Sequence, residues 1–461
     1  MTASTAATRP RPRWAAAAAL AIGLAGCGTA VPDAAPGPGA TGLFDSSQVH
    51  TVSVQVDEAD VAAMISEYRT SGEKTWIPGT VTIDGTELSD VGLRLKGNSS
   101  LRMTSSDADP ATLPWLVRLD KYVDGQSYGE VRSFVVRSNV TATAVNEAVA
   151  LELIELAGLA SQQATPVRLT VNDGAPTLRL VIENPDEVWE ASVFDSPGLL
   201  YKSEAQGNWS YRGDDPASYT DVFDQQAGED DLTPLIEFLD FVNNADDATF
   251  AAEIADHLDV ESFSRYLAVQ ELVGNFDDIS GPGNNSYLRY DAETGKFTVV
   301  SWDQNLSFGA MNQMVPGGAG EGVADGAQAP PGGAPGAGGL GQRPSAGELP
   351  SAPDGRTAEP PGGMGDPGDL PGGMGDPRDL PGGMGGMGGM GGNILAERFR
   401  AVPELAALYD EAVADLTAEL IDSGVAADVL ATWVTVLTEH ADDLVDTATI
   451  EQDAAAVATY L

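Results

Sequence analysis

Residues 275–309, which read NFDDISGPGNNSYLRYDAETGKFTVVSWDQNLSFG, are the most informative stretch of the sequence. Residues 287–290 and 297–300 are predicted to form the two strands of a β-hairpin. Asp277 and Asn285 precede this hairpin and Asp303 follows it, so the hairpin brings three oxygen-bearing side chains together. Phosphoryl transfer uses such a set, because one carboxylate orients the attacking hydroxyl while other oxygens hold magnesium on the phosphates.

The apolar pattern of the flanking chain predicts an α+β fold. Alternating apolar residues predict strands at 52–56, 81–83, 91–95, 115–119, 133–137, 167–171, 178–182 and 198–201. Helical spacing predicts helices at 57–68, 141–157, 232–241, 248–257, 260–273, 394–421 and 426–445. A β-rich front part and a more helical back part favour α+β over a regular βαβ repeat.

The N-terminus is predicted to direct the protein out of the cytoplasm. Basic residues precede a short apolar run that ends in Leu-Ala-Gly-Cys at Cys27, as in a secretory signal. This ending resembles a bacterial lipobox, so residues 1–27 are predicted to be a lipoprotein signal peptide with Cys27 as the lipidation site. The alternative is a plain signal peptide that contains a cysteine. An extracytoplasmic protein held on the cell membrane by a lipid is therefore expected, with residues 28–46 as a flexible tether.

Composition divides the rest of the chain into three segments. Residues 315–393 repeat units such as Pro-Gly-Gly-Met-Gly-Asp-Pro and contain too little apolar surface to offset the entropy of ordering. They are predicted to form a disordered insert between a folded core at 47–314 and C-terminal helices at 394–461 that pack on that core.

Charge and motifs exclude several classes of function. The net charge of −45 argues against nucleic acid and against an anionic membrane surface as partners. His50, His257 and His440 lack ligand-like spacing for a metallohydrolase, and no Gly-x-Ser-x-Gly elbow indicates a serine hydrolase. With Cys27 as its single cysteine, the mature chain is predicted to contain no disulfide.

A small polar loop after the strand at 91–95 is a candidate phosphate-binding loop. It comprises Lys96, Gly97, Asn98 and Ser99, whose backbone N–H groups are suited to phosphate oxygens, although an ordinary β-turn has the same composition. Arg118 on a neighbouring strand is predicted to direct a cation toward this loop. Glu147, on the helix that follows, is predicted to pair with that cation, as a helix Glu does with a strand Lys in protein kinases.

Together these segments resemble the CotH kinase family, the spore-coat-protein-H-like secreted kinases with an atypical protein-kinase-like fold. The resemblance covers roughly residues 50–310, and no single motif carries it. The matching segments occur in the family's order: Leu95 to Ser100, Arg118 to Tyr122, Asn146-Glu147, Val181 to Glu183, Gly198 to Lys202, Asn275 to Asp277, Asn285 to Leu288, and Ser301 to Gly309.

The resemblance implies a role for each matching residue. Asp277 would be the catalytic residue that orients the substrate hydroxyl, and Asn285 and Asp303 would hold Mg²⁺ or Mn²⁺ on ATP. Asp278 and Asn284 remain alternatives to Asp277 and Asn285. The nucleotide would contact the Lys96–Ser99 loop, Arg118, Glu147, Glu183 on the hinge side, and Lys202.

Three classes of function follow from these patterns. The first is an ATP- and Mg²⁺-dependent kinase that phosphorylates Ser or Thr of a secreted or cell-surface protein, or another hydroxyl substrate. The second is a pseudokinase, a lipoprotein that binds a nucleotide or divalent cation without turnover. The third is a structural cell-envelope protein whose acidic face and Met-Gly segment are the functional parts.

Overall fold

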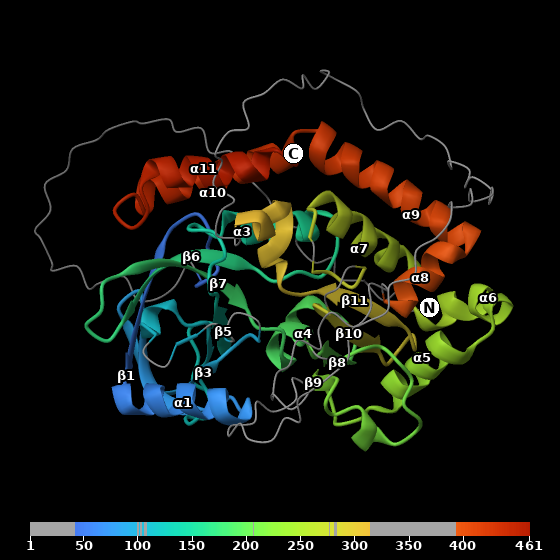
Figure 1. The fold of residues 1–461 in the computed structure, drawn as a ribbon, viewed down its shortest axis with the longest axis horizontal. Helices are drawn as coiled ribbons and strands as arrows, with labels where there is room; N and C mark the ends of the chain where they lie inside the picture. The colour runs from blue at the N-terminus through green and yellow to red at the C-terminus, as the bar shows by residue number, and fades with distance from the viewer. Residues whose placement is uncertain are drawn as a thin grey trace, which may run out of the picture. The chain divides into compact units, whose positions relative to one another are not determined.

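A computed structural model describes residues 42–98, 101, 104–105, 108–205, 207–275, 277–280, 284–313 and 393–461. The predicted signal peptide with Cys27, the tether as far as residue 41, Ser99 and residues 315–392 of the predicted insert lie outside these described residues. Within them, strands dominate the N-terminal part and helices the C-terminal part, which confirms the α+β prediction (Figure 1).

Seven of the described strands close into a barrel in the order β1-β2-β3-β4-β5-β7-β6. Their bounds are β1 His50–Val56, β2 Ile77–Ile83, β3 Thr86–Leu95, β4 Trp115–Arg118, β5 Ser133–Val136, β6 Ala164–Val171 and β7 Thr177–Glu183. The parallel pairing of β1 with β6 completes the closure. Alternation along β3 and β4 directs Leu95, Trp115 and Val117 into the barrel core, while Arg94 and Lys96 lie on its outer side.

The second sheet contains the predicted hairpin and has the strand order β11-β10-β8-β9. Its strands are β8 Gly198–Ser203, β9 Phe223–Ala227, β10 Ser286–Asp291 and β11 Phe297–Ser301. The hairpin register, with Ser286 opposite Ser301, confirms the predicted pairing. Strand β9 was not predicted, because its polar residues Asp224, Gln225 and Gln226 hide its strand character.

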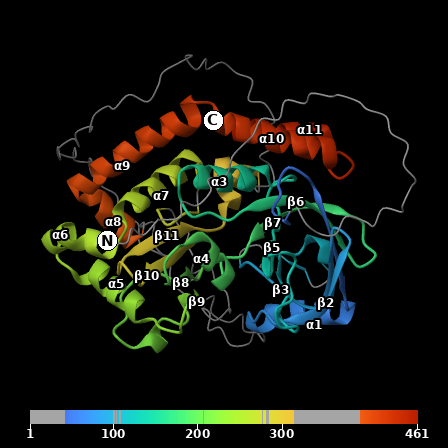
Figure 2. The same ribbon diagram turned by 180° about the vertical axis from the view of Figure 1, so that it is seen from behind.

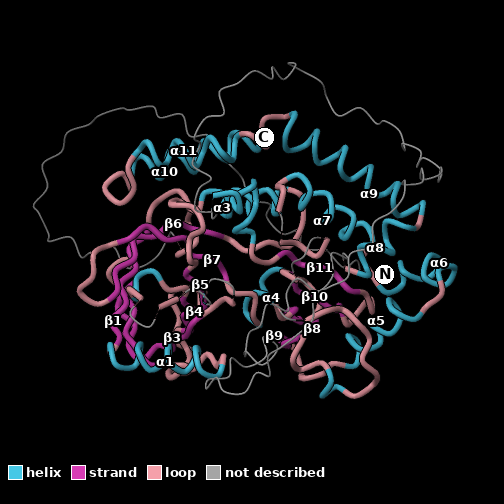
Figure 3. The backbone as a smooth tube through the Cα atoms, viewed as in Figure 1, coloured by secondary structure: helices cyan, strands magenta, loops and turns pink. Residues whose placement is uncertain are grey.

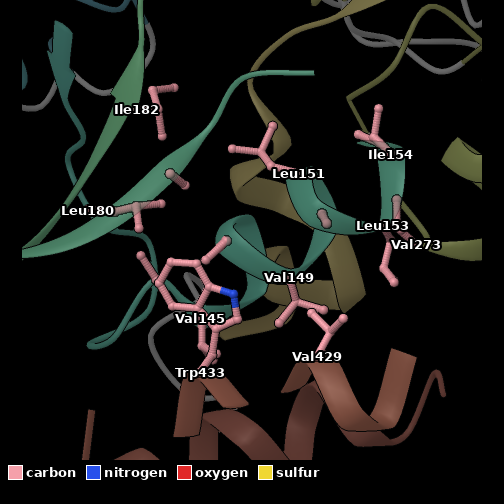
Figure 4. Packing of buried hydrophobic residues seen from close by; sticks show 14 of the residues in the cluster. Val145, Val149, Leu151, Leu153, Ile154, Leu180, Ile182, Val273, Val429 and Trp433 are labelled. Atoms are coloured by element: carbon pink, nitrogen blue, oxygen red, sulfur yellow. The ribbon is translucent and has the colours of Figure 1, made fainter. Parts of the chain in front are cut away.

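Helices from both halves of the chain pack against the two sheets (Figures 2 and 3). Their bounds are α1 Glu58–Ser71, α3 Val145–Leu156, α4 Glu187–Val193, α5 Thr233–Asn244, α6 Asp247–His257, α7 Val260–Leu272, α8 Ile394–Ala401, α9 Pro403–Leu416, α10 Val425–His440 and α11 Thr447–Ala458. Apolar side chains of α3 pack between β7 and α10, where Leu180, Val149 and Trp433 belong to one buried cluster (Figure 4). This packing fixes α3, which carries Glu147, against the barrel.

Several predicted helices have different limits in the structure; the one predicted at 426–445, for example, is α10 and ends at His440. Helix α3 begins at Val145 instead of residue 141, because Ala144 adopts a left-handed conformation (φ 54°) and Asp453 of α11 binds the backbone and hydroxyl of Thr143. The single helix predicted at 394–421 is wrong. It breaks at Val402, because Pro403 lacks an N–H and excludes helical geometry at the preceding residue.

Short helix α4 and the last helix, α11, were not predicted. None of the described helices is by itself long and apolar enough to cross a membrane, although Pro403–Asp422 and Val425–His440 together meet that length and composition across a 47° bend.

Candidate active site

A cavity of about 340 Å³ lies where the outer face of the barrel meets one end of the second sheet. Its described lining contains Lys74, Arg94, Lys96, Gly97, Asn98, Arg137, Lys202, Ser203, Glu204, Ala205, Asp224, Gln226, Asp277, Asn284, Asn285, Trp302 and Asp303. The cavity therefore brings the candidate phosphate loop, Lys202 and all three predicted oxygen side chains into one site.

The register of the second sheet explains why these residues meet. Ser301 of β11 pairs with Ser286 of β10, and Lys202 of β8 lies opposite Tyr287 on one side and Asp224 of β9 on the other. The end of β11, the start of β10 and the end of β8 consequently lie at the same edge. Asp303, two residues beyond β11, and Asn285, directly before β10, are neighbours for this reason.

Asp277 and Asn285 are joined by a direct hydrogen bond. Asn285 Nδ2 donates to Asp277 Oδ2 at 2.7 Å and to the Asp277 backbone carbonyl at 3.1 Å. Burial and the negative charge of Asp303 raise the pKa of Asp277 to about 6, although the bond from Asn285 opposes this shift. Asp277 is therefore a carboxylate of increased basicity, as a general base near neutral pH requires.

The neighbours of these two residues have other roles. Asp278 is buried outside the cavity lining and accepts a hydrogen bond from the Ser280 backbone. Asn284 lines the cavity, but its amide accepts from Trp209 Nε1 at 3.0 Å and donates to the Glu204 carbonyl at 2.8 Å. The geometry thus favours Asp277 over Asp278 as the base, and Asn285 over Asn284 as a metal ligand.

The raised pKa of Asp277 has a consequence for stability in the metal-free protein. Because its folded pKa lies above the ordinary value of 3.8, ionisation of Asp277 costs stability, and the cost develops as the pH rises from about 4 through about 6. Asp277→Asn should therefore raise the free energy of unfolding by at most about 3 kcal/mol at about pH 8 and have little effect below about pH 4. Urea unfolding with a chelator present tests this. Asp221→Asn, at an exposed carboxylate, is the control, and an equal effect of Asp277→Asn at both pH values would contradict the prediction.

Asp303 forms an ion pair with Arg137, which also pairs with the buried Glu147. Arg137 Nε donates to Glu147 at 2.9 Å, and Arg137 Nη2 donates to Asp303 Oδ1. The side chains of Arg137 and Glu147 are only 7% and 2% exposed. Asp303 also adopts a left-handed backbone conformation (φ 58°), which an Asp tolerates better than most residues and which neighbouring contacts must maintain. The ion pair with the Arg137 guanidinium is one such contact.

The ion pairs of Arg137 change two of the predictions made from the sequence. The predicted pairing of Arg118 with Glu147 is wrong, because Arg118 is 54% exposed, bonds to Asp120 at 2.8 Å and lies outside the cavity lining. Strand β4 directs Arg118 to solvent, and Arg137 at the end of β5 takes the place beside Glu147. Glu147 touches Arg137 rather than the cavity, so its position favours a supporting role over direct nucleotide contact.

Glu183 also lies away from the cavity lining. Its carboxylate accepts a hydrogen bond from the Gln163 backbone at 2.9 Å, and burial raises its pKa to about 7. The following residue, Asn184, reaches the site instead, because its side-chain oxygen accepts from Lys96 Nζ at 3.4 Å. Lys96 and Asn184 thus connect the phosphate-loop candidate with the chain that leaves the barrel after β7.

The cations of the site are mutually repulsive. Lys96 is buried, and its pKa is well below the ordinary value because of that burial and because Lys202, Arg94 and Lys74 add positive charge. Lys202 forms an ion pair with Glu204 at 2.8 Å. A buried lysine whose pKa is lowered by neighbouring cations is suited to binding an anion, which would relieve the repulsion.

A buried amide network connects the loops that carry the two aspartates. Asn275 Nδ2 donates to Gln270 of α7 at 2.8 Å and to Gln304 at 3.3 Å, while Asn275 Oδ1 accepts from the backbone N–H of Asp277. Gln270 Nε2 also donates to Ser301 at the end of β11. The network therefore fixes Asp277 relative to the Asp303 loop.

The donor set fits a magnesium ion that arrives with phosphates. Among the described residues no group of three His, Cys, Asp or Glu side chains forms a complete metal site. Mg²⁺ is usually held by one or two carboxylates together with substrate phosphates and water. Asp303 and the side-chain oxygen of Asn285 are suitable ligands, and the mutual repulsion of Asp277 and Asp303 is the kind of local negative charge that a cation neutralises.

Sequence reasoning missed Lys74, Arg94, Arg137 and Asp224 in the site. Arg94 near the end of β3 and Lys96 directly after it lie two residues apart, and this spacing was a usable signal that both face the same side. Arg137 is the last residue of the strand predicted at 133–137, directly after the observed end of β5, and had the same kind of signal. Lys74 and Asp224 come from an irregular loop and an unpredicted strand, so no local pattern indicated them.

Fold and site together define a class: an α+β protein with a charged cavity between a barrel and a second sheet. The sequence model described as CotH kinase protein matches residues 93–343, which is more than half of the 461-residue chain. The protein therefore belongs to the CotH kinase family. It is also similar to the inner spore coat protein H of Bacillus subtilis (strain 168), with 26% identity over 165 residues. That match covers 34% of this chain and 45% of the relative, so the chain spans less than half of the relative's length.

Proposed function

We propose that the protein is an ATP- and Mg²⁺-dependent kinase that transfers a phosphoryl group to a hydroxyl of a secreted or cell-surface protein, or to another hydroxyl substrate. The observation that carries this proposal is the meeting of Asp277, Asn285 and Asp303 with the Lys96 loop and Lys202 in one cavity. Membership of a family named for kinase activity supports it.

Each side chain has a chemical task in this proposal. Asp277 accepts the proton of the attacking hydroxyl, whose oxygen forms a bond to the terminal phosphorus while the bond to the bridging oxygen breaks. Lys96 and Lys202 balance the negative charge that develops on the departing diphosphate. Bound Mg²⁺ would neutralise phosphate charge from the side of Asp303 and Asn285.

The arrangement of the supporting residues Arg137 and Glu147 also resembles that of a residue pair in protein kinases. The ion pair between Arg137 on the barrel and Glu147 on α3 has the form of the strand-Lys to helix-Glu pair of protein kinases, with Arg in place of Lys. Arg keeps the charge but presents a planar fork, and that fork reaches Glu147 and Asp303 together. We further propose that a lipid attached to Cys27 anchors the protein to the cell membrane and that the protein acts outside the cytoplasm.

Labelled ATP tests the proposal directly. The purified full-length chain is incubated with ATP labelled in the terminal phosphate, Mg²⁺ or Mn²⁺, and a degenerate mixture of Ser- and Thr-containing peptides, beside the Asp303→Asn variant. Metal-dependent release of ADP with label on peptide or protein is expected, and Asp303→Asn should abolish it. Tight ATP binding with no transfer under any condition would support the pseudokinase, and failure to bind ATP would refute both.

A further inference from the structure

The two loops that carry Asp277 and Asp303 are joined by a backbone hydrogen bond. The N–H of Phe308 donates to the carbonyl of Val273 at 2.7 Å. Val273 directly follows α7 and lies four residues before Asp277. Phe308 lies five residues after Asp303. The position of one aspartate relative to the other therefore depends on this junction between Val273 and Phe308.

Left-handed backbone conformations occur on both sides of the junction. Gly274 and Gly309 directly follow its two residues and have φ angles of 57° and 67°. Phe308 itself has a φ angle of 56° and is 3% exposed. This conformation is costly for an aromatic residue and persists only where surrounding contacts maintain it. The junction therefore needs support beyond its own hydrogen bond.

The aromatic ring of Tyr460 lies on both glycines of the junction. A methyl group added to Gly274 would lie 2.9 Å from Cε1 of this ring, and one added to Gly309 would overlap the Tyr460 hydroxyl. The ring also packs edge-on against Phe308, with 5.8 Å between the ring centres and 73° between the ring planes. The missing side chains at both glycines make room for the ring. Tyr460 thus contacts both loops at once.

Helix α11 provides Tyr460 with a fixed base. Tyr460 follows the end of α11 by two residues, and its N–H donates to the Val457 carbonyl at 3.0 Å. Within α11, the carboxylate of Asp453 accepts from the N–H of Thr143 at 3.0 Å and from the Thr143 hydroxyl at 2.7 Å. Asp453 is only 6% exposed. The helix is therefore anchored to the segment before α3, independently of its contact with the two loops.

We propose that Tyr460 is a positioning residue, whose ring holds the Asp277 and Asp303 loops at the separation that phosphoryl transfer requires. It acts through the backbone of these loops and not on a reacting group. Tyr460 also lies beyond residues 93–343, the part of the chain that the family model matches. Its effect on turnover rests on the proposed kinase function, whereas its hold on the two loops is measurable without turnover.

The separation of the two aspartates matters because the proposed base and the metal-bound phosphate must meet in one geometry. A displacement of about 1 Å between reacting groups can lower a rate by about a hundredfold. Tyr460 is 42% exposed, so truncation of its side chain removes less packing than truncation of a core residue would. Loss of the ring should therefore loosen the junction between the loops while the protein remains folded.

Substitutions of Tyr460 in the full-length chain test this role. With labelled ATP and peptide, Tyr460→Ala should lower kcat by about tenfold or more and change KM for ATP by less than about threefold. Tyr460→Phe keeps the ring, so its kcat should stay within about threefold of wild type. Tyr122→Ala is the matched control, since Tyr122 is 48% exposed. Hydrogen–deuterium exchange of peptides that contain Asp277 or Asp303 should be faster in Tyr460→Ala than in the other three proteins.

A second set of variants isolates the contact between Tyr460 and Gly309. Gly309→Ala introduces a methyl group that meets the Tyr460 hydroxyl, in addition to the strain of alanine at a φ angle of 67°. Tyr460→Phe removes this hydroxyl and leaves the backbone strain unchanged. Gly309→Ala should therefore lower Tm less in the Tyr460→Phe background than in the wild-type background. Equal losses of Tm in the two backgrounds would refute the contact.

Loop exchange and turnover together separate the positioning role from the kinase proposal. Faster exchange in both loops of Tyr460→Ala with a lower kcat supports the role. Unchanged exchange in this variant, or faster exchange with an unchanged kcat, overturns it. If wild type binds ATP but transfers no phosphate, the kinase proposal fails; faster exchange then still supports the hold of Tyr460 on the loops, and unchanged exchange refutes it. Circular dichroism verifies folding, and the Gly309→Ala comparison decides if Tyr460→Ala does not fold.

Discussion

Replacing Asp277 with Asn is expected to lower the turnover rate for phosphoryl transfer by about 10²–10⁴-fold, the usual contribution of a positioned general base. The Asn side chain keeps the size of Asp277 and an oxygen that can still accept from Asn285 Nδ2, so the loop should retain its geometry. It cannot take a proton from the acceptor. Nucleotide affinity should change little, because Lys96, Lys202 and Asp303 remain in place. Steady-state kinetics with separate kcat and KM values are the measurement.

The split between kcat and KM distinguishes catalysis from binding at Asp277. A loss confined to KM would assign the residue to binding and contradict the proposed base. Asp278→Asn is the control for the neighbouring carboxylate. Because Asp278 lies outside the cavity lining, a loss of turnover in the folded Asp278→Asn variant as large as that of Asp277→Asn would reverse the assignment.

Replacing Arg137 with Met should cost about 3–5 kcal/mol of unfolding free energy, as expected when one partner is removed from a buried ion pair. Glu147 would remain as a buried carboxylate without its cation, and burial already raises the pKa of Glu147. Asp303 would lose the contact that holds it in its left-handed conformation. Urea unfolding measures the loss, with Arg118→Met as the exposed control.

A double-mutant cycle tests whether Arg137 and Glu147 act as a pair. The double variant, which combines Arg137→Met with Glu147→Leu, removes both charges. Its loss of unfolding free energy should therefore be smaller than the sum of the losses of the two single variants. The double variant should still show impaired transfer, since Asp303 loses its positioning group. Additive losses in stability would contradict a direct pairing energy.

Local patterns predicted much of this molecule because its strands and hairpins are locally specified. Asp84 and Gly85 have the positive φ angles that a tight hairpin turn between β2 and β3 requires, and Asp-Gly is the usual sequence for it. The hairpin of β10 and β11 was evident from its apolar run for the same reason. Both features depend on neighbouring residues alone.

Long-range geometry was not accessible in the same way. Closure of the barrel depends on the parallel pairing of β1 with β6, more than 100 residues apart in sequence. The partner of Glu147 depends on which barrel strand lies nearest α3, so Arg118 and Arg137 were equivalent by pattern although only Arg137 makes the contact. Asp277 and Asp303 could be predicted because one hairpin joins them, whereas Lys74 and Asp224 enter the site only through tertiary packing.

Phosphoryl transfer compared at equal occupancy of the site tests whether Asp277 is the catalytic base of a kinase. Wild-type protein, Asp277→Asn and Arg118→Gln are each saturated with Mg²⁺ and terminally labelled ATP, occupancy is verified by filtration, and label on peptide and protein hydroxyls is counted after a quench. We expect transfer by wild type and Arg118→Gln, and transfer at least about a hundredfold slower by fully occupied Asp277→Asn. Equal labelling by Asp277→Asn, or a wild-type protein that fills with ATP and never transfers phosphate, would contradict this expectation.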